Sequence, residues 1–187
     1  MGTIREPEQA KLFAGIIAAS QAEADKAVEE LKKSCGKVDL KSPAIDFKFT
    51  DYYSAEMGRE LIRFWVSFEN LIDPAVVARV KRESNRIESL FGQPGKRRVN
   101  IDPGYITPAK VVLASSKDYS HRIYLGEGIY AEVTLIYRHK VFTALEWTYP
   151  DYQSKPAHEF FLEARKIHQI QLKAGGKPGD SRRTEIL

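Results

Sequence analysis

Hydrophobic and polar positions along the first third of the chain change from an apolar run to a helical period. Residues 11–19 (KLFAGIIAA) are apolar at consecutive positions, which predicts a strand buried on both faces at the centre of a sheet. Ser20, with Glu23 three residues later, forms a capping-box pattern and predicts a helix start. That helix is expected to end at Gly36 and to bury Ala24, Ala27, Val28 and Leu31.

Three further segments complete a regular order of elements. Residues 44–50 (AIDFKFT) and 61–69 (LIRFWVSFE) alternate and predict a second and a third strand. Asp73-Pro74 predicts the start of a helix that runs to Gly92, and residues 97–102 (RRVNID) predict a fourth strand. The β-α-β-β-α-β order predicts an α+β fold with a ferredoxin-like core.

The remaining segments predict an extension of this core. Residues 108–114 fit either a short helix or a strand, residues 120–145 a β-hairpin or meander, and residues 156–173 a C-terminal helix. The chain is therefore expected to form a single α+β domain over residues 1–173. Its last part, 174–187, is rich in Gly and charged residues and is predicted to be a disordered tail.

The expected hairpin carries a polar face. A loop at residues 126–128 would place Tyr124 opposite Tyr130 and Arg122 opposite Glu132. This register also pairs Ser120 with Thr134 and exposes these polar side chains together. His121 would then lie on the other, apolar face with Ile123 and Leu125.

The candidate binding site lies where this polar face meets residues 115–122 and a turn expected at 102–105. Lys117 and Arg122 would bind phosphate, because a cationic donor makes a strong hydrogen bond to an anion. The other expected ligand-binding residues are Ser116, Ser120, Tyr124, Tyr130 and Tyr105, the last placed just beyond a tight turn at 102–104. The candidates for an acid–base role are Asp102, Asp118 and Glu132.

Three Asp-Tyr dipeptides recur at predicted loops or element boundaries, at 51–52, 118–119 and 151–152. Tyrosines beside carboxylates would suit a pocket for a polar aromatic ligand, and chance recurrence is the competing explanation.

Composition narrows the class of protein. A formal net charge of +4 is mildly basic. The excess of positive charge is concentrated between Arg79 and Arg98, a stretch that forms either a solvated helix face or an anion-binding surface.

The four histidines and the single Cys35 do not have the paired spacing of metal ligands, so no metal and no cofactor are predicted. Cys35 is interpreted as a packing residue. No segment suits a membrane span or a signal peptide, and a cytoplasmic protein is expected.

Two long blocks, NIDPGYIT and SKDYSHRIYLGEGIYAEVTL, are similar to those of an uncharacterised prokaryotic domain-of-unknown-function family. Some members carry the label "GTP-binding protein". The sequence offers no mechanism for that label, because LFGQPGKRR lacks phosphate-loop spacing and SSKD is not the Asn-Lys-x-Asp guanine reader.

Residues 11–91 also resemble RNA-recognition-motif domains in part, through LFAGII and FWVSFENLIDPAVV. That resemblance implies base stacking on an exposed sheet face by Phe13 and Trp65, with Arg63 at a third position. Three hypotheses therefore stand: a small phosphorylated or nucleotide-like ligand, single-stranded RNA, or a structural or protein-interaction module without a ligand.

Overall fold

The computed structural model describes residues 2–93 and 95–175, which form a mixed α+β structure built on a large antiparallel sheet. The strands are β1 (Ala10–Ala18), β2 (Val38–Lys41), β3 (Ile45–Asp46), β4 (Ile62–Ile72), β5 (Val99–Ile106), β6 (Lys110–Ser115), β7 (Ile123–Gly126), β8 (Ile129–Arg138) and β9 (Val141–Ala144). The helices are α1 (Gln21–Cys35), α2 (Ser54–Met57), α3 (Val77–Glu88) and α4 (Lys155–Ala174), with 3-10 turns η1 (Pro74–Val76), η2 (Ser89–Phe91) and η3 (Pro150–Gln153).

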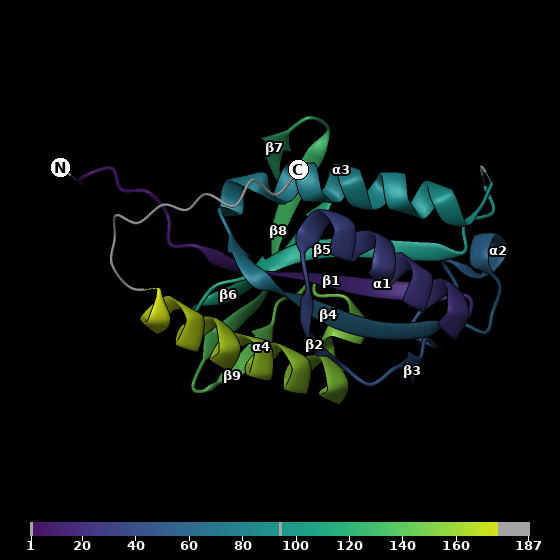
Figure 1. Ribbon diagram of the computed structural model, residues 1–187. Helices are drawn as coiled ribbons and strands as arrows, with labels where there is room; N and C mark the ends of the chain where they lie inside the picture. The colour runs from purple at the N-terminus through teal and green to yellow at the C-terminus, as the bar shows by residue number, and fades with distance from the viewer. Residues whose placement is uncertain (1, 94, 176–187) are drawn as a thin grey trace.

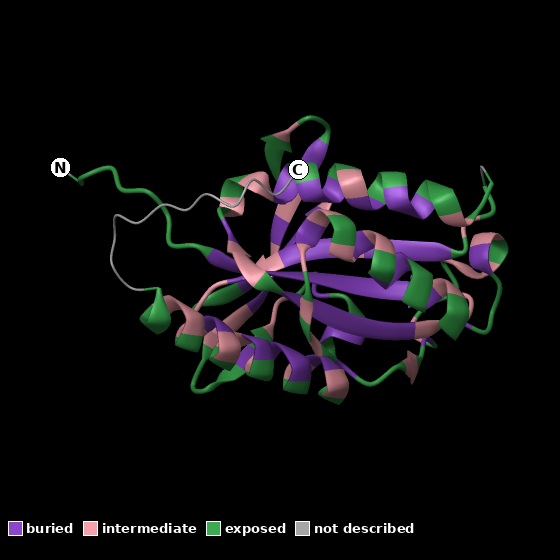
Figure 2. Cartoon of the chain, in the orientation of Figure 1, coloured by how far each residue is buried: buried purple, intermediate pink, exposed green. Residues whose placement is uncertain are grey.

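The strands follow the order β2-β4-β1-β5-β6-β8-β7, with β3 also on β4 and β9 also on β8. Helices α1 and α3 cover one face of the sheet, and α4 covers the other (Figure 1). The central strands are buried almost throughout, while the outward sides of the helices are exposed (Figure 2). No helix among the described residues is both long enough and apolar enough to cross a bilayer.

Two main hydrophobic cores lie between the sheet and the helices on its two faces. The apolar side chains of β1 contribute to both cores and, through Ile17, to a smaller cluster, so the prediction of a central strand buried on both faces is confirmed. On β4, Phe64 and Phe68 pack toward α1, whereas Trp65 packs with Phe161 of α4. The predicted helix caps are also present, since Ser20 accepts a hydrogen bond from the Glu23 amide and Asp73 from the Ala75 amide.

The prediction for the second strand was wrong in position. The strand beside β4 is β2, followed by a break and then the two-residue β3, so residues 47–50 are not in a strand. Pro43 cannot donate to a ladder, and in the break the Ser42 hydroxyl accepts from the Trp65 amide at 3.0 Å. After β3, the Phe47 amide still donates to the Leu61 carbonyl at 2.8 Å, and residues 48–50 then continue as a loop.

The tight turn expected at 102–104 does not exist. Residues 99–106 form one strand, in which Asp102 pairs with Gly15 and Pro103 with Ala14. Pro103 is tolerated because β6 joins β5 only from Gly104 onward. The open question at 108–114 is settled as a strand, since β6 spans Lys110–Ser115.

Side chains from α3 complete the backbone hydrogen bonding of β5 where β6 has diverged. The Ile101 amide donates to Glu88 Oε1, and Lys81 Nζ donates to the Ile101 carbonyl, both at 2.7 Å. A buried backbone group without a hydrogen-bond partner costs about 1–3 kcal/mol. These two contacts satisfy the Ile101 amide and carbonyl, which β6 does not pair, and so avoid that cost.

The C-terminal helix α4 ends at Ala174, one residue beyond the predicted 173. Most of the predicted tail, residues 176–187, lies outside the described residues.

Candidate functional site

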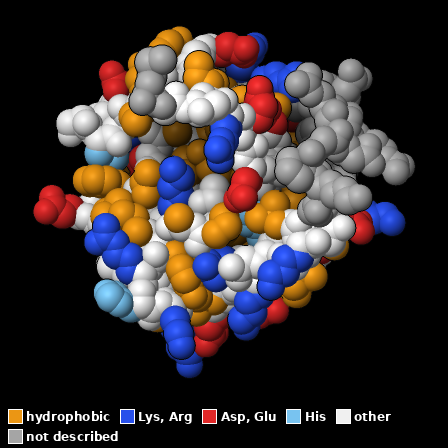
Figure 3. Space-filling model, turned by 90° about the vertical axis from the view of Figure 1, so that its left-hand side faces the viewer, with side chains coloured by type: hydrophobic (Ala, Val, Ile, Leu, Met, Phe, Trp, Pro, Cys, Tyr) orange, Lys and Arg blue, Asp and Glu red, His pale blue; other side chains and the backbone are white. Residues whose placement is uncertain are grey.

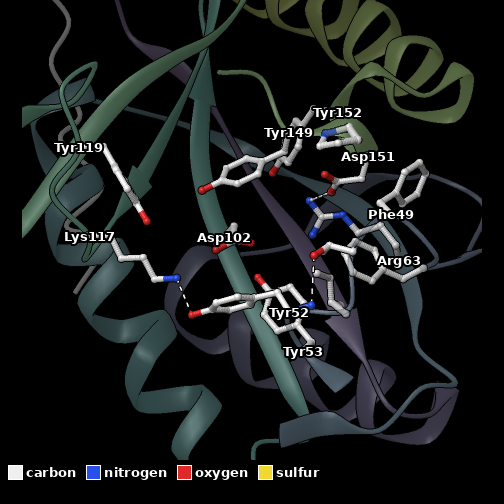
Figure 4. Close-up of a pocket in the computed structure, with 14 residues that line it drawn as sticks. Phe49, Tyr52, Tyr53, Arg63, Asp102, Lys117, Tyr119, Tyr149, Asp151 and Tyr152 are labelled. Carbon is white, nitrogen blue, oxygen red and sulfur yellow. Dashed lines mark hydrogen bonds and ion pairs between the residues drawn. The ribbon is translucent and has the colours of Figure 1, made fainter. Parts of the chain in front are cut away.

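A pocket of about 450 Å³ opens beside β5, where β6 diverges from it (Figure 4). Its lining comes from β1, β4, β5, the loop after β3, the β6–β7 connection and η3. The lining residues are Ile17, Phe47, Phe49, Thr50, Tyr52, Tyr53, Arg63, Asp102, Lys117, Tyr119, Tyr149, Pro150, Asp151 and Tyr152.

The floor of the pocket holds Arg63, a β4 side chain that is only 1% exposed. Its Nη2 forms an ion pair with Asp151 Oδ2 at 2.9 Å, and its guanidinium lies over the rings of Trp65 and Tyr152 at 4.7 and 5.0 Å. Nε and Nη1 of Arg63 are buried and have no hydrogen-bond partner among the described residues. The guanidinium at the base of the cavity therefore has N–H donors without hydrogen-bond partners among the described residues.

The surrounding negative groups keep the Arg63 guanidinium on the pocket floor positively charged. Burial alone would lower the pKa of Arg63, but Asp151 and the other negative groups around it outweigh burial and raise the pKa. Burial raises the pKa of Asp151, and the positive charge of Arg63 opposes that rise.

Gly15 of β1 makes the space that the Arg63 guanidinium occupies. A Cβ placed on Gly15 would lie 2.6 Å from Arg63 Nη2 and 2.8 Å from the Tyr152 hydroxyl. Both atoms are buried, so neither can simply swing into solvent. A glycine in the middle of an otherwise apolar strand is the sequence signal of this close approach.

Asp102 of β5 is the second carboxylate of the pocket, and its side chain is 30% exposed. Oδ2 accepts from Asn100 Nδ2 at 2.8 Å, and Lys81 Nζ lies 3.5 Å from Oδ1. In Figure 4, Asp102 lies near the centre of the cavity, between Lys117 and Arg63.

The rim consists of exposed cationic and aromatic side chains. Lys117 Nζ donates to the Tyr52 hydroxyl at 2.7 Å and lies 4.3 Å from that ring's centroid. Tyr119 and Tyr149 form the opposite part of the rim. Burial raises the pKa of Tyr149, so its hydroxyl is neutral at ordinary pH.

Arg122 does not face the ligand space. It donates to Glu132 Oε2 at 2.7 Å, to Ser115 Oγ and the Lys117 carbonyl at 2.9 Å each, and to the Tyr149 hydroxyl at 2.7 Å. Four of its five N–H groups are thereby used. Arg122 thus positions the Lys117 backbone and Tyr149, on two sides of the pocket.

The expected faces of the hairpin were wrong. Arg122 and Glu132 are buried, whereas Ile123 is 73% exposed and Leu125 43% exposed. His121 lies on the same side as the ion pair, with Nε2 3.1 Å from Glu132 Oε2. Two features explain the error: residues 119–122 form a turn, so strand alternation does not extend to His121, and residues 145–149 cover the polar face of β8.

The predicted register holds only in part. Tyr124 pairs with Tyr130 as expected, and a bulge then places Gly126 opposite Ile129. Ser120 is exposed in the turn and does not pair with Thr134.

Of the residues predicted for a small ligand, Lys117 and Asp102 line the pocket. The others of that set lie elsewhere. Ser116, Ser120 and Asp118 are exposed outside it, and Tyr124 packs on Tyr130 with ring centroids 5.1 Å apart on the hairpin. Tyr105 is half-buried and packs against the hydrophobic clusters to which α1 and α3 contribute.

The face proposed for RNA is not available. Phe13 and Trp65 are each 0% exposed and pack against Phe161, at ring-centroid distances of 5.0 and 6.3 Å. Helix α4 covers this face of the sheet, so neither ring can stack on a base. Arg63, the third residue of that hypothesis, belongs to the floor of the pocket instead.

The basic stretch around α3 is largely neutralised by acidic partners. Ion pairs join Arg82 to Glu127, Arg86 to Glu83, Arg98 to Glu23, Arg97 to Glu56 and Glu88, and Lys81 to Glu88 and Asp102. On the end of the molecule seen in Figure 3, basic, acidic and hydrophobic side chains are interspersed. A phosphate backbone requires free positive charge, so these observations do not favour nucleic acid.

The tyrosine of each Asp-Tyr dipeptide lines the pocket, at Tyr52, Tyr119 and Tyr152. The recurrence was therefore the sequence signal closest to the site, although it gave no means of placing the three loops together. Tyr53, Tyr149 and Asp151 were missed as site residues, and Arg63 was named only for base stacking. Among residues 2–93 and 95–175, no group of three or more His, Cys, Asp or Glu side chains could hold a metal ion.

Comparisons with known proteins give a family and no function. A family model described as "Domain of unknown function (DUF4416)" matches residues 8–168, so the chain belongs to that family. This confirms the resemblance to a domain of unknown function. No curated protein matches the chain, and no solved structure matches it.

Proposed function

We propose that this member of the DUF4416 family binds a small ligand with a flat ring and an anionic group, phosphorylated or nucleotide-like, in the pocket beside β5. The volume of about 450 Å³ lies within the range of roughly 300–1,000 Å³ usual for small-molecule sites.

The observation that carries this proposal is Arg63. A guanidinium with two unpartnered nitrogens is costly to bury. Neither nitrogen is exposed to the cavity, so an anion at the pocket floor would satisfy them as neighbouring side chains move aside. Asp151 already pairs with Nη2 and holds the guanidinium plane in one orientation. Lys117 at the rim supplies a second positive charge on the path into the cavity.

The aromatic lining supports the ring part of the ligand. Seven of the lining side chains are Phe or Tyr, and Tyr52 and Tyr119 stand at the entrance, 61% and 55% exposed. Exposed aromatic faces at a cavity mouth suit stacking on a planar group, at about 1–3 kcal/mol per stacked base.

The fold supplies the elements that would form the walls of the proposed site. The strand order β2-β4-β1-β5, with α1 and α3 on one face, supports a ferredoxin-like core. The strands β6 to β9 and helix α4 then form the extension that supplies one pocket wall and covers the opposite face of the sheet.

A thermal-shift panel of nucleotides, sugar phosphates and aromatic carboxylates tests the proposal. A ligand at 100 times its Kd stabilises the folded state by about 2.7 kcal/mol, which raises the melting temperature measurably. Lys117→Ala and Tyr119→Ala should reduce the shift without unfolding the protein, because both side chains are exposed. Lys26→Ala, on the exposed side of α1, is the matched control and should leave the shift unchanged.

If no compound shifts the melting temperature, the ligand proposal fails and the structural or interaction module remains. If a compound binds equally well to Lys117→Ala, Tyr119→Ala and the control, the site lies elsewhere on the protein.

A further inference from the structure

The charges in the pocket limit which anion it can accept. Among the described lining residues, the cations Arg63 and Lys117 are matched by the carboxylates Asp102 and Asp151. The rest of the described lining is uncharged, and burial raises the pKa of Tyr53, Tyr149 and Tyr152, so these hydroxyls add no charge at neutral pH.

The two carboxylates have different positions relative to the cations. Asp151 is committed to Arg63 and leaves the Nε and Nη1 side of the guanidinium unpartnered. Asp102 has no direct contact with either lining cation, and it lies between Arg63 and Lys117 in Figure 4. An anion bound by either cation therefore lies in the field of the Asp102 carboxylate.

Lys81 offsets this field only in part. Its ammonium lies 3.5 Å from Asp102, but its closest contact is the Ile101 carbonyl at 2.7 Å, and it also pairs with Glu88. Lys81 is not part of the pocket lining, so a ligand meets the carboxylate and not the ammonium.

We infer that the pocket selects ligands with one anionic group on a ring-bearing body, such as a nucleoside monophosphate, over di- and triphosphates, and that Asp102 sets this selectivity. The inference rests on the proposed function. One phosphate would be bound by the free side of Arg63 or by Lys117, and each further phosphate would add charge close to Asp102.

Asp102 also has a positive role in this scheme. An ionised carboxylate accepts at about four lone-pair sites, and Asn100 and Lys81 use two of them. The remaining sites can accept hydrogen bonds from ligand hydroxyl or amino groups. A ring-bearing ligand with one anionic group and such donors satisfies Arg63 and Asp102 together, which a polyphosphate tail does not.

The test compares each ribonucleoside monophosphate with the triphosphate of the same base by isothermal titration calorimetry. The buffer contains EDTA, because bound Mg²⁺ would neutralise part of the triphosphate. Aromatic carboxylates and inorganic phosphate form separate arms, which distinguish the source of the anionic group and the need for the ring. We expect the preferred ligand with one anionic group to bind at least about tenfold more tightly than any triphosphate, because the Asp102 carboxylate repels the added phosphates.

Asp102→Asn should reduce that ratio, chiefly by tightening triphosphate binding, since the amide keeps the shape and removes the charge. Asp118→Asn is the matched control, because Asp118 is an exposed carboxylate on the β6–β7 connection outside the pocket. It should leave the ratio unchanged. Since the wild-type comparison needs no variant, a poorly folded Asp102→Asn protein does not prevent the test.

The two proposals fail differently. A triphosphate that binds as tightly as its monophosphate, or a ratio equally changed by Asp118→Asn, overturns the inference and leaves the ligand pocket standing. If neither nucleotides nor ring carboxylates bind, the proposed function fails, and the inference fails with it.

Discussion

Arg122 Nε and Glu132 Oε2 lie 2.7 Å apart in an ion pair whose side chains are 2% and 1% exposed. The pair joins β8 to the turn before β7, and Arg122 continues from it to the Lys117 carbonyl and the Tyr149 hydroxyl. On a surface such an ion pair would contribute little to stability. Here it is buried and holds in place the Arg122 side chain, which contacts two parts of the pocket lining.

Removing one partner of this pair should be costly. Glu132→Ala leaves the Arg122 charge buried without compensation, and we expect the free energy of unfolding to fall by about 3–5 kcal/mol. Urea denaturation measures the change. Glu163→Ala, which removes the exposed i,i+3 pair with Lys166, is the control and should cost about 1 kcal/mol or less. Equal costs for the two variants would contradict the internal role of Glu132.

Gly15→Ala tests the space reserved for the arginine. The new methyl group forces the Arg63 guanidinium and the Tyr152 hydroxyl to move, and overpacking of this kind costs about 1–3 kcal/mol. We expect lower stability by thermal melting and weaker binding of any ligand found in the panel. Gly2→Ala, whose added methyl meets nothing within 4 Å, serves as the control. Unchanged ligand affinity in Gly15→Ala would show that Arg63 does not contact the ligand.

The buried tyrosines predict an alkaline limit to stability. Burial raises the pKa of Tyr53 and Tyr152 above the ordinary value of 10.0, so the folded state holds these protons more tightly than the unfolded state. Their contribution is therefore fully present below pH 10 and is lost as the pH rises beyond it. In an absorbance titration with parallel circular dichroism, the exposed tyrosines should ionise first and the buried ones only as the protein unfolds. Tyr152→Phe should make the alkaline loss of stability shallower.

Cys35 should be chemically silent in the folded protein. It is 1% exposed, and burial followed by the charge of Glu83 raises its thiol pKa to about 12, so little reactive thiolate exists near neutral pH. A thiol reagent such as a disulfide dye should label the protein only in denaturant. A Ser120→Cys variant provides an exposed thiol as the positive control. Rapid labelling of native Cys35 would contradict its interpretation as a packing residue.

Much of the fold follows from local patterns in the sequence. The apolar run of β1 and the caps at Ser20 and Asp73 act over a few residues, and each was predicted because neighbouring side chains determine it. The shift from residues 44–50 to β2 and β3 was not predictable in this way. It depends on which segment the edge of β4 accepts, which is a tertiary choice.

The site was predicted less completely because its parts are distant in sequence. Tyr52, Tyr119 and Tyr152 come from three loops that only the finished sheet brings together. Arg122 and Glu132 were correctly paired, but their burial depends on residues 145–149, which no strand pattern places over β8. Asp102 was named for a turn that is absent, although it does line the pocket.

The short pairing of β5 with β6 has a structural consequence for the pocket. The two strands share only three register pairs, from Gly104–Leu113 to Ile106–Val111, and Asp102 and Lys117 lie just past the last of these pairs on diverging segments. Among the described residues, no β5–β6 hydrogen bond closes the gap between these two side chains, so the cavity there is bounded by side chains and not by a backbone ladder.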